Sequence, residues 1–226
     1  MRGRRLGVVA ASVALLFLTG CGDQLRSSLV GQVGTRLVPA LAGTGPSAEE
    51  AAAQAAAMGF GPDAIAANPE NYMLFQVGGL GIAGLGRVVS EHDNLRTWLG
   101  DSGYSVSIEN GLVVATRGFG KDIMAADVVS VRAAIDAGGG EAVRLHDYLD
   151  SRDQIVQERY ACVIASAGLQ PVDLGLRQVE AEAYAETCRG TRVQFENMYF
   201  IGESGGIIAS RQFVSDVVGY LSNNIL

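Results

Sequence analysis

A predicted β-hairpin centred on Asn110-Gly111 constrains the fold of this chain more than any other local feature. The residues before the turn, 104–109, alternate between apolar and polar side chains, which is the pattern of a half-buried strand. A second run of β-favouring residues, 112–117, follows directly. Asn-Gly between two such runs is typical of a type I′ turn, because both central residues must adopt positive φ. The sequence therefore predicts two antiparallel strands here.

Further β-favouring segments surround this hairpin. We expect strands at residues 72–77, 95–99, 143–149, 154–165 and 177–188, and a second hairpin from residues 194–201 and 207–214. Residues 122–135 have a mixed pattern that fits a short helix or a loop. Because no alternation of strands and helices is visible, the predicted fold class is mainly β, an antiparallel β-barrel or sandwich.

One short helix is expected before the strands. Ser47 and Glu50 have the spacing of a capping box, in which each residue satisfies a backbone N–H of the other. The alanine-rich residues that follow have high helix propensity, and Gly59 ends the run. The predicted fold is therefore a β-rich domain with a short N-terminal helix.

The N-terminus has the features of an export signal. Three arginines within residues 1–5 precede 13 apolar or small residues, 6–18, whereas about 20 are needed to cross a bilayer as a helix. The run Leu18-Thr19-Gly20-Cys21 resembles the lipobox of bacterial lipoproteins, in which the signal is removed before the cysteine and the thiol is lipidated. This resemblance implies lipidation of Cys21 and attachment to membrane lipid.

The predicted boundaries follow from this signal. We expect a signal peptide at residues 1–20, a lipidated tether at 21–45 and a β-rich periplasmic domain at 46–226. Gly22, and not aspartate, follows the cysteine. By the same resemblance, this implies the periplasmic face of the outer membrane.

Charge argues against a nucleic-acid partner. Three of the 17 basic residues lie in the signal, so the mature chain, with 24 acidic residues, has a net charge of −10. Its basic residues are scattered, whereas nucleic-acid binding requires a stripe of lysine and arginine that displaces counterions. We therefore predict no nucleic-acid partner.

Two cysteines remain after lipidation of Cys21, and both lie on expected strands. An exported domain folds where disulfides form, and two free thiols are unusual there, so we predict a Cys162–Cys188 bond. Closing this loop would contribute roughly 3.5 kcal/mol. Two separate buried thiols are the alternative. Because there is no Cys-x-x-Cys pair and only two histidines, we expect no metal and no other cofactor.

Two glycine-rich motifs need a structural context that the sequence does not supply. Residues 79–84 match G-x-G-x-x-G, but the dinucleotide motif requires a following helix, and the residues here favour strand. Residues 202–206 match the G-x-S-x-G of serine hydrolases around Ser204. The following residues again favour strand, so a hairpin loop is preferred. A periplasmic serine hydrolase acting through Ser204 is nevertheless the alternative function.

Three other sets of residues are candidates for sites. His92 and His146, each beside an aspartate, are the available bases for Ser204, and we expect both at the surface. Asp122 and Asp127 could form a carboxylate pair for glycoside chemistry, but a solvated loop is favoured. Trp98 could stack on a sugar ring, although packing in the core is the commoner use.

Two longer segments resemble a known family. Residues 112–127 resemble a hallmark stretch of the YjbF/GfcB lipoproteins of exopolysaccharide and group 4 capsule operons. The C-terminal block of that family is matched by Phe195-Glu196-Asn197-Met198-Tyr199-Phe200, Ser210-Arg211-Gln212-Phe213 and Gly219-Tyr220-Leu221. With the lipobox and the cysteine pair, the likeness spans residues 70–222.

The resemblance implies a process and a location, and no reaction. It implies a β-barrel-like fold that works beside an outer-membrane β-barrel and periplasmic proteins of polysaccharide export. The first hypothesis is therefore a non-catalytic accessory lipoprotein that binds polysaccharide, a partner or both, and we expect no enzymatic activity. The candidate binding residues are Trp98, Arg117, Asp122, Asp127 and Arg211. The two arginines could bind an acidic sugar bidentately, or form internal salt bridges.

Overall fold

The structure is a computed structural model that describes residues 47–226. Cys21, the signal peptide and the tether predicted for residues 1–45 lie outside the described residues. The strands are β1 (Tyr72–Val77), β2 (Ile82–His92), β3 (Leu95–Gly100), β4 (Ser105–Glu109), β5 (Leu112–Arg117), β6 (Ala125–Asp127), β7 (Gly139–Leu149), β8 (Ile155–Asp173), β9 (Gln178–Arg189), β10 (Gln194–Ile201), β11 (Ile207–Ser215) and β12 (Gly219–Ile225). The helices are α2 (Ala48–Ala55), α3 (Pro62–Ala67) and α4 (Val129–Asp136), with short helical turns at Ala56–Phe60, Pro69–Asn71 and Gly78–Leu80.

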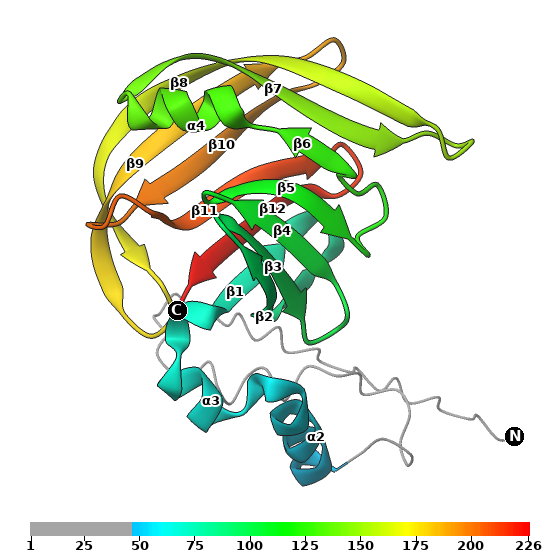
Figure 1. Ribbon diagram of the computed structural model, residues 1–226, viewed down its shortest axis with the longest axis vertical. Coiled ribbons are helices and arrows are strands. Elements are labelled where there is room, and N and C mark those ends of the chain that lie inside the picture. Colours follow the sequence, from blue (N-terminus) through cyan, green and yellow to red (C-terminus); the bar gives the residue numbers. More distant parts are fainter. Residues whose placement is uncertain (1–46) are drawn as a thin grey trace, which may run out of the picture.

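The strands form one antiparallel sheet that curls into a nearly closed barrel (Figure 1). Its order is β5-β4-β3-β2-β1-β12-β11-β10-β9-β8-β7-β6, so the two edge strands, β5 and β6, are consecutive in the chain. The mainly β prediction is confirmed.

The two edge strands, β5 and β6, meet at a seam of the barrel, and the loop between them joins its two sides. The Thr116 amide donates to the Ile123 carbonyl at 3.0 Å, which joins β5 to the chain just before β6. Helix α4 lies beside this seam, and its buried Val131 and Ile135 share a core cluster with Leu112 of β5. The seam is therefore closed partly by hydrogen bonds and partly by a packed helix.

The predicted hairpin at Asn110-Gly111 is confirmed. Glu109 pairs with Leu112, and φ is 49° at Asn110 and 83° at Gly111, as a type I′ turn requires. A Cβ on Gly111 would also overlap Ile207 of β11. Glycine is needed here both for its φ and for the close approach of β11. The second hairpin, formed by β10 and β11, also lies where the sequence predicts it.

The glycine motif at residues 79–84 belongs to the turn between β1 and β2 and to β2 itself. A Cβ on Gly84 would lie 3.2 Å from the Phe75 ring, and one on Gly100 of β3 would lie 2.9 Å from it. The missing side chains therefore make room for Phe75, which is buried in the core. The motif is thus part of a turn and a strand, in agreement with the prediction that its residues favour strand over the helix of a dinucleotide site.

Strand β8 continues well beyond the predicted end at residue 165. A register shift between Ser166 and Gly168, with φ of 77° at Gly168, bends the strand without ending it. Pro171 is tolerated because β7 pairs with β8 only as far as Ala165, which leaves one edge without a neighbour. Glycine and proline favour turns in a sequence, so this extension was missed.

The N-terminal helix forms as predicted. Ser47 Oγ accepts from the Glu50 amide, and the Glu50 carboxylate accepts from the Ser47 amide. Helix α2 has no buried residue, and Tyr72 Oη donates to the Gly59 carbonyl at 2.6 Å to fix the following turn. Between residues 47 and 226, no helix has the length and apolar character needed to span a membrane.

Candidate functional site

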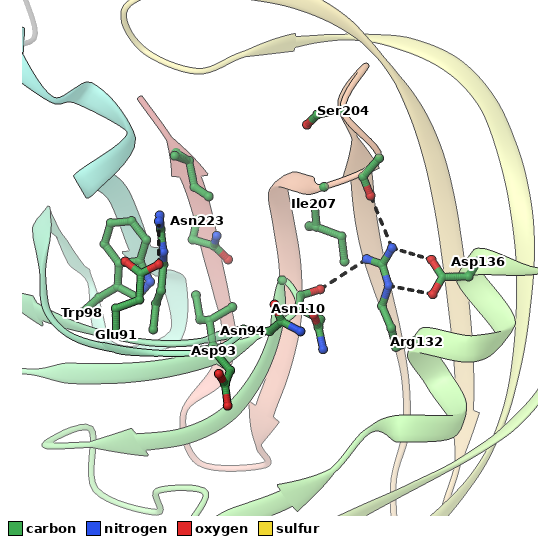
Figure 2. Close-up of a pocket in the computed structure, with 16 residues that line it drawn as sticks. Glu91, Asp93, Asn94, Trp98, Asn110, Arg132, Asp136, Ser204, Ile207 and Asn223 are labelled. Atoms are coloured by element: carbon green, nitrogen blue, oxygen red, sulfur yellow. Dashed lines mark hydrogen bonds and ion pairs between the residues drawn. The ribbon is translucent and has the colours of Figure 1, made fainter.

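A cleft of about 610 Å³ opens at one end of the barrel (Figure 2). Three hairpin turns, β2–β3, β4–β5 and β10–β11, form its rim together with α4 and the end of β12. These turns meet because antiparallel strands return to the same end of a barrel at every second connection. The volume falls within the roughly 300–1,000 Å³ typical of small-molecule sites.

Arg132 of α4 holds the rim together. Its Nη1 donates to the Asn110 carbonyl and its Nη2 to the Gly205 carbonyl, both at 3.3 Å, so α4 is tied to two hairpin turns (Figure 2). The Asp136 carboxylate accepts from Nε at 3.1 Å and from Nη2, which fixes the guanidinium. The Asn110 amide in turn donates to the Asn94 carbonyl of the β2–β3 turn at 3.0 Å.

The wall of the cleft includes an aromatic side chain and several amides. Trp98 of β3 lines it although only 2% of the residue is exposed. Asn94, Asn110 and Asn223 line it as well. The lining is therefore mainly polar, with carboxylates and amides that can hydrogen-bond a polar ligand.

A separate cluster of polar side chains lies inside the barrel, where it is closed to solvent. Arg144 of β7 donates from Nε and Nη2 to the Glu186 carboxylate at 3.1 and 3.0 Å, and both residues are fully buried. Tyr199 Oη and Asn197 Nδ2 also donate to Glu186, at 2.5 and 2.6 Å. A buried ion pair is tolerated when its remaining donors and acceptors are satisfied, as they are here. We assign this cluster a structural role.

His146 extends the buried cluster, and its predicted surface position is wrong. Its Nδ1 is 2.9 Å from Tyr148 Oη, which donates to the Val214 carbonyl at 2.5 Å. The prediction relied on the neighbouring Asp147, but adjacent residues of a strand point to opposite faces, so Asp147 can lie outside while His146 lies inside. Burial, and then the charge of Arg144, hold the pKa of His146 well below its usual range. The imidazole is therefore neutral at pH 7.

Ser204 lies on the rim of the cleft, apart from the groups that would activate it. His146 is buried and bonded inside the barrel, and His92 is exposed and paired with Asp93 at 3.4 Å. No hydrogen bond joins Ser204 to either histidine among residues 47–226. A serine nucleophile needs a bonded base and an orienting acid, and the described residues do not assemble them here.

Of the candidate binding residues, Trp98 alone lines the cleft within the described chain. Arg117 and Asp122 lie at the barrel seam. Arg117 donates to the carbonyls of Thr116, Ile123 and Met124 at 2.6 to 3.2 Å. The Asp122 carboxylate accepts from Thr116 Oγ1 at 2.7 Å and from the Gly118 amide at 2.9 Å. Both side chains therefore join β5 to the loop that follows it.

The other two candidates lie elsewhere. Asp127 accepts from the amide of Val129, the first residue of α4, at 3.1 Å. Arg211 lies in the middle of β11, where its guanidinium carbon is 3.4 Å from the centre of the Tyr220 ring and Nη1 is 3.5 Å from the Glu196 carbonyl. The structure does not bring these candidates together into one site.

Sequence reasoning missed most of the cleft. Asn94, the Arg132–Asp136 pair of α4 and Asn223 are far apart in the sequence and match no motif. The one available signal was the pair of hairpin turns, because loops at the end of a barrel are common positions for binding residues.

The disulfide between Cys162 and Cys188 joins directly opposite residues of β8 and β9. Glu186 lies close enough to both sulfurs for the three residues to resemble a metal site, but the sulfurs are already bonded to each other. The cysteine pair therefore cross-links the sheet.

These observations define a nearly closed antiparallel β-barrel with an open, polar cleft at one end. Residues 24–226 match the family described as group 4 capsule polysaccharide lipoprotein gfcB, YjbF, and the chain belongs to this family. Membership indicates a lipoprotein of the cell envelope with a part in capsule polysaccharide production.

A solved structure supports the fold. The crystal structure of the hypothetical lipoprotein YmcC from Escherichia coli K12 is similar, with a TM-score of 0.59 at 16% sequence identity. The match covers 69% of this chain and 85% of that one. At this identity the likeness concerns the fold alone. The comparison with curated protein sequences found no match.

Proposed function

We propose that the protein is an outer-membrane lipoprotein, anchored on the periplasmic face through Cys21, that assists the secretion of capsule or exopolysaccharide without catalysing a reaction. Family membership supports the polysaccharide process. The lipobox-like run at residues 18–21 supports the anchor, and Gly22 supports the outer membrane as its location. Two or three acyl chains on one cysteine would hold stably, whereas one chain binds marginally.

The cleft is the observation that carries the proposal. It is concave, it is lined by hydrogen-bonding groups, and it has Trp98 in its wall. Sugars present many hydroxyls, so the amides and carboxylates of the cleft suit them chemically. The rim is also rigid, because Arg132 joins its parts. The protein would thus hold a segment of the exported glycan beside its partners in the envelope.

Contacts with other proteins are part of the same proposal. The family resemblance implies an outer-membrane β-barrel and periplasmic proteins of polysaccharide export as partners. Residues 47–71 join the barrel at the rim of the cleft, where Arg96 Nη1 donates to the Glu70 carbonyl at 3.3 Å. The cleft would therefore lie at the end of the barrel from which the lipidated tether leaves.

Deletion of the gene followed by complementation tests this function. We expect deletion to lower secreted polysaccharide and the wild-type chain to restore it. The Ser204→Ala variant should restore secretion equally, because its hydroxyl has no catalytic part. The Cys21→Ala variant should restore it poorly, with the chain found in the soluble periplasmic fraction. Unchanged secretion after deletion would reject the proposal, and failure of a folded Ser204→Ala chain would favour a hydrolase.

A further inference from the structure

The charged groups that line the cleft differ in how far they reach solvent. In the Arg132–Asp136 pair the arginine side chain is 21% exposed and the aspartate 55%. In the Arg96–Glu91 pair the values are 33% and 48%. Asp93, on the β2–β3 turn, is 86% exposed. The accessible charge at the rim is therefore mainly negative.

Both arginines are ion-paired within the protein. Arg132 donates to Asp136 and to the carbonyls of Asn110 and Gly205. Arg96 donates to Glu91 at 3.1 Å and to the Glu70 carbonyl. Binding an anionic ligand bidentately through Arg132 would require breaking these contacts. Arg132 therefore shapes the cleft, and the positive charge of each arginine is already balanced by a carboxylate.

A buried amide supplies an uncharged donor. Asn223 of β12 is 4% exposed, and its Oδ1 accepts from Ser210 Oγ at 2.6 Å. Its Nδ2 has no partner among residues 47–226. Because Asn223 lines the cleft, this N–H group is available to a ligand there.

From these contacts we infer that the cleft binds uncharged sugar residues and disfavours acidic ones. The inference rests on the proposed function and specifies the class of glycan. Sugar hydroxyls donate to the exposed carboxylates of Asp93, Asp136 and Glu91, and accept from Asn223 Nδ2. A uronic acid brings a further negative charge to the same rim, where Arg96 and Arg132 are already paired with carboxylates.

Matched oligosaccharides test the inference. The probes are β-linked hexamers of glucose, mannose and galactose, each compared with the hexamer of its uronic acid, titrated into the folded domain at low ionic strength. We expect at least one neutral hexamer to bind at least tenfold more tightly than its acidic counterpart. Tighter or equal binding of the acidic hexamers would overturn the inference, and so would the absence of binding by all three neutral hexamers.

A pair of glycine variants locates the binding. A Cβ on Gly206, on the cleft rim, would lie 3.7 Å from Ser204 Oγ, which is ordinary contact, so Gly206→Phe would place a ring at the cleft. Gly78, at the opposite end of the barrel, has open space around it. Gly206→Phe should abolish neutral-sugar binding and Gly78→Phe should leave it unchanged. Retained binding in a folded Gly206→Phe chain would overturn the assignment to this cleft.

Removing one negative charge from the rim tests whether charge repulsion causes the preference for neutral sugars. Asp93 has φ of 51°, a conformation that asparagine also adopts readily, so Asp93→Asn preserves the turn. We expect this variant to narrow the preference for neutral over acidic hexamers by roughly two- to fivefold, since one exposed charge has a modest effect. An unchanged preference would contradict charge repulsion as its cause.

These outcomes separate the inference from the proposed function. If acidic hexamers bind in the cleft and Gly206→Phe abolishes that binding, the protein still binds glycan and only the inferred sugar class is wrong. If deletion of the gene leaves secretion unchanged, the proposed function fails whatever the binding experiments show.

Discussion

Single residues inside the barrel combine charge with complete burial, and this makes their stability effects large. Glu186 accepts from Arg144, Tyr199 and Asn197, and all four residues are buried. Removing one partner of such a pair leaves an uncompensated buried charge. The same change on an exposed pair has little effect, because water replaces the lost partner.

Glu186→Gln should therefore destabilise the domain by about 3–5 kcal/mol, because Arg144 keeps its charge without a counterion. The free energy of unfolding in urea measures the effect. Glu182→Gln is the matched control: it lies on the same strand, is exposed, and should cost less than about 1 kcal/mol. If the free energy of unfolding of Glu186→Gln lies within about 1 kcal/mol of that of the wild type, the Arg144–Glu186 pair contributes little to stability.

Stability should also depend on the proton affinity of His146. Burial and the charge of Arg144 lower the pKa of the native imidazole well below its ordinary value of 6.5. Below about pH 6.5 the unfolded chain binds a proton that the native chain does not, so stability falls as pH falls. The contribution of this group to the slope of the free energy of unfolding against pH approaches about 1.4 kcal/mol per pH unit.

Unfolding measured between pH 7.5 and 5.5 tests this. His146→Gln should reduce the slope below pH 6.5, whereas His92→Gln at the exposed turn should leave it unchanged. Equal slopes for wild type and His146→Gln would show that His146 titrates normally in the native state.

The residue scale is also where sequence-based prediction of the site was weakest. Trp98 could be singled out because it is the only tryptophan of the chain and an aromatic ring can stack on a sugar. Asn223 and Arg132 were not, because their partners are distant in sequence and no motif connects them. Arg117 and Asp122 stood in a family-like segment, and the structure shows them bonded to backbone groups at the barrel seam.

At the scale of elements the sequence was more informative. The hairpin at Asn110-Gly111 could be predicted from the sequence, because the positive φ values of a type I′ turn are a property of these two residues. The capping box of Ser47 and Glu50 was equally local. The continuation of β8 past Gly168 was missed because a bulge and an unpaired edge, which are tertiary features, make glycine and proline acceptable there.

The β8–β9 hairpin should owe part of its stability to the Cys162–Cys188 bond. The cysteines are 26 residues apart, and opening a loop of this size should cost about 3.5 kcal/mol. Urea unfolding with and without a thiol reductant measures the loss. A Cys162→Ala/Cys188→Ala double variant should resemble the reduced wild type and no longer respond to reductant. An unfolding midpoint of the wild type that reductant does not move would contradict this contribution.

For the whole molecule, barrel closure determines where the candidate site forms. Antiparallel order brings the β2–β3, β4–β5 and β10–β11 turns to one end, and α4 ties two of them together through Arg132. The fold class was predictable from alternation and turn residues. The cleft was not, because it exists only after strands from both halves of the chain have met around the barrel.

The most direct test of this account is the amount of polysaccharide secreted by cells whose single copy of the gene carries Gly206→Phe. Gly78→Phe, the same change at the far end of the barrel, is the control, and both chains must be present at wild-type levels in the membrane fraction. The account predicts that Gly206→Phe lowers secretion toward that of the deletion strain while Gly78→Phe does not. Wild-type secretion by the Gly206→Phe cells would contradict a role for the cleft in this process.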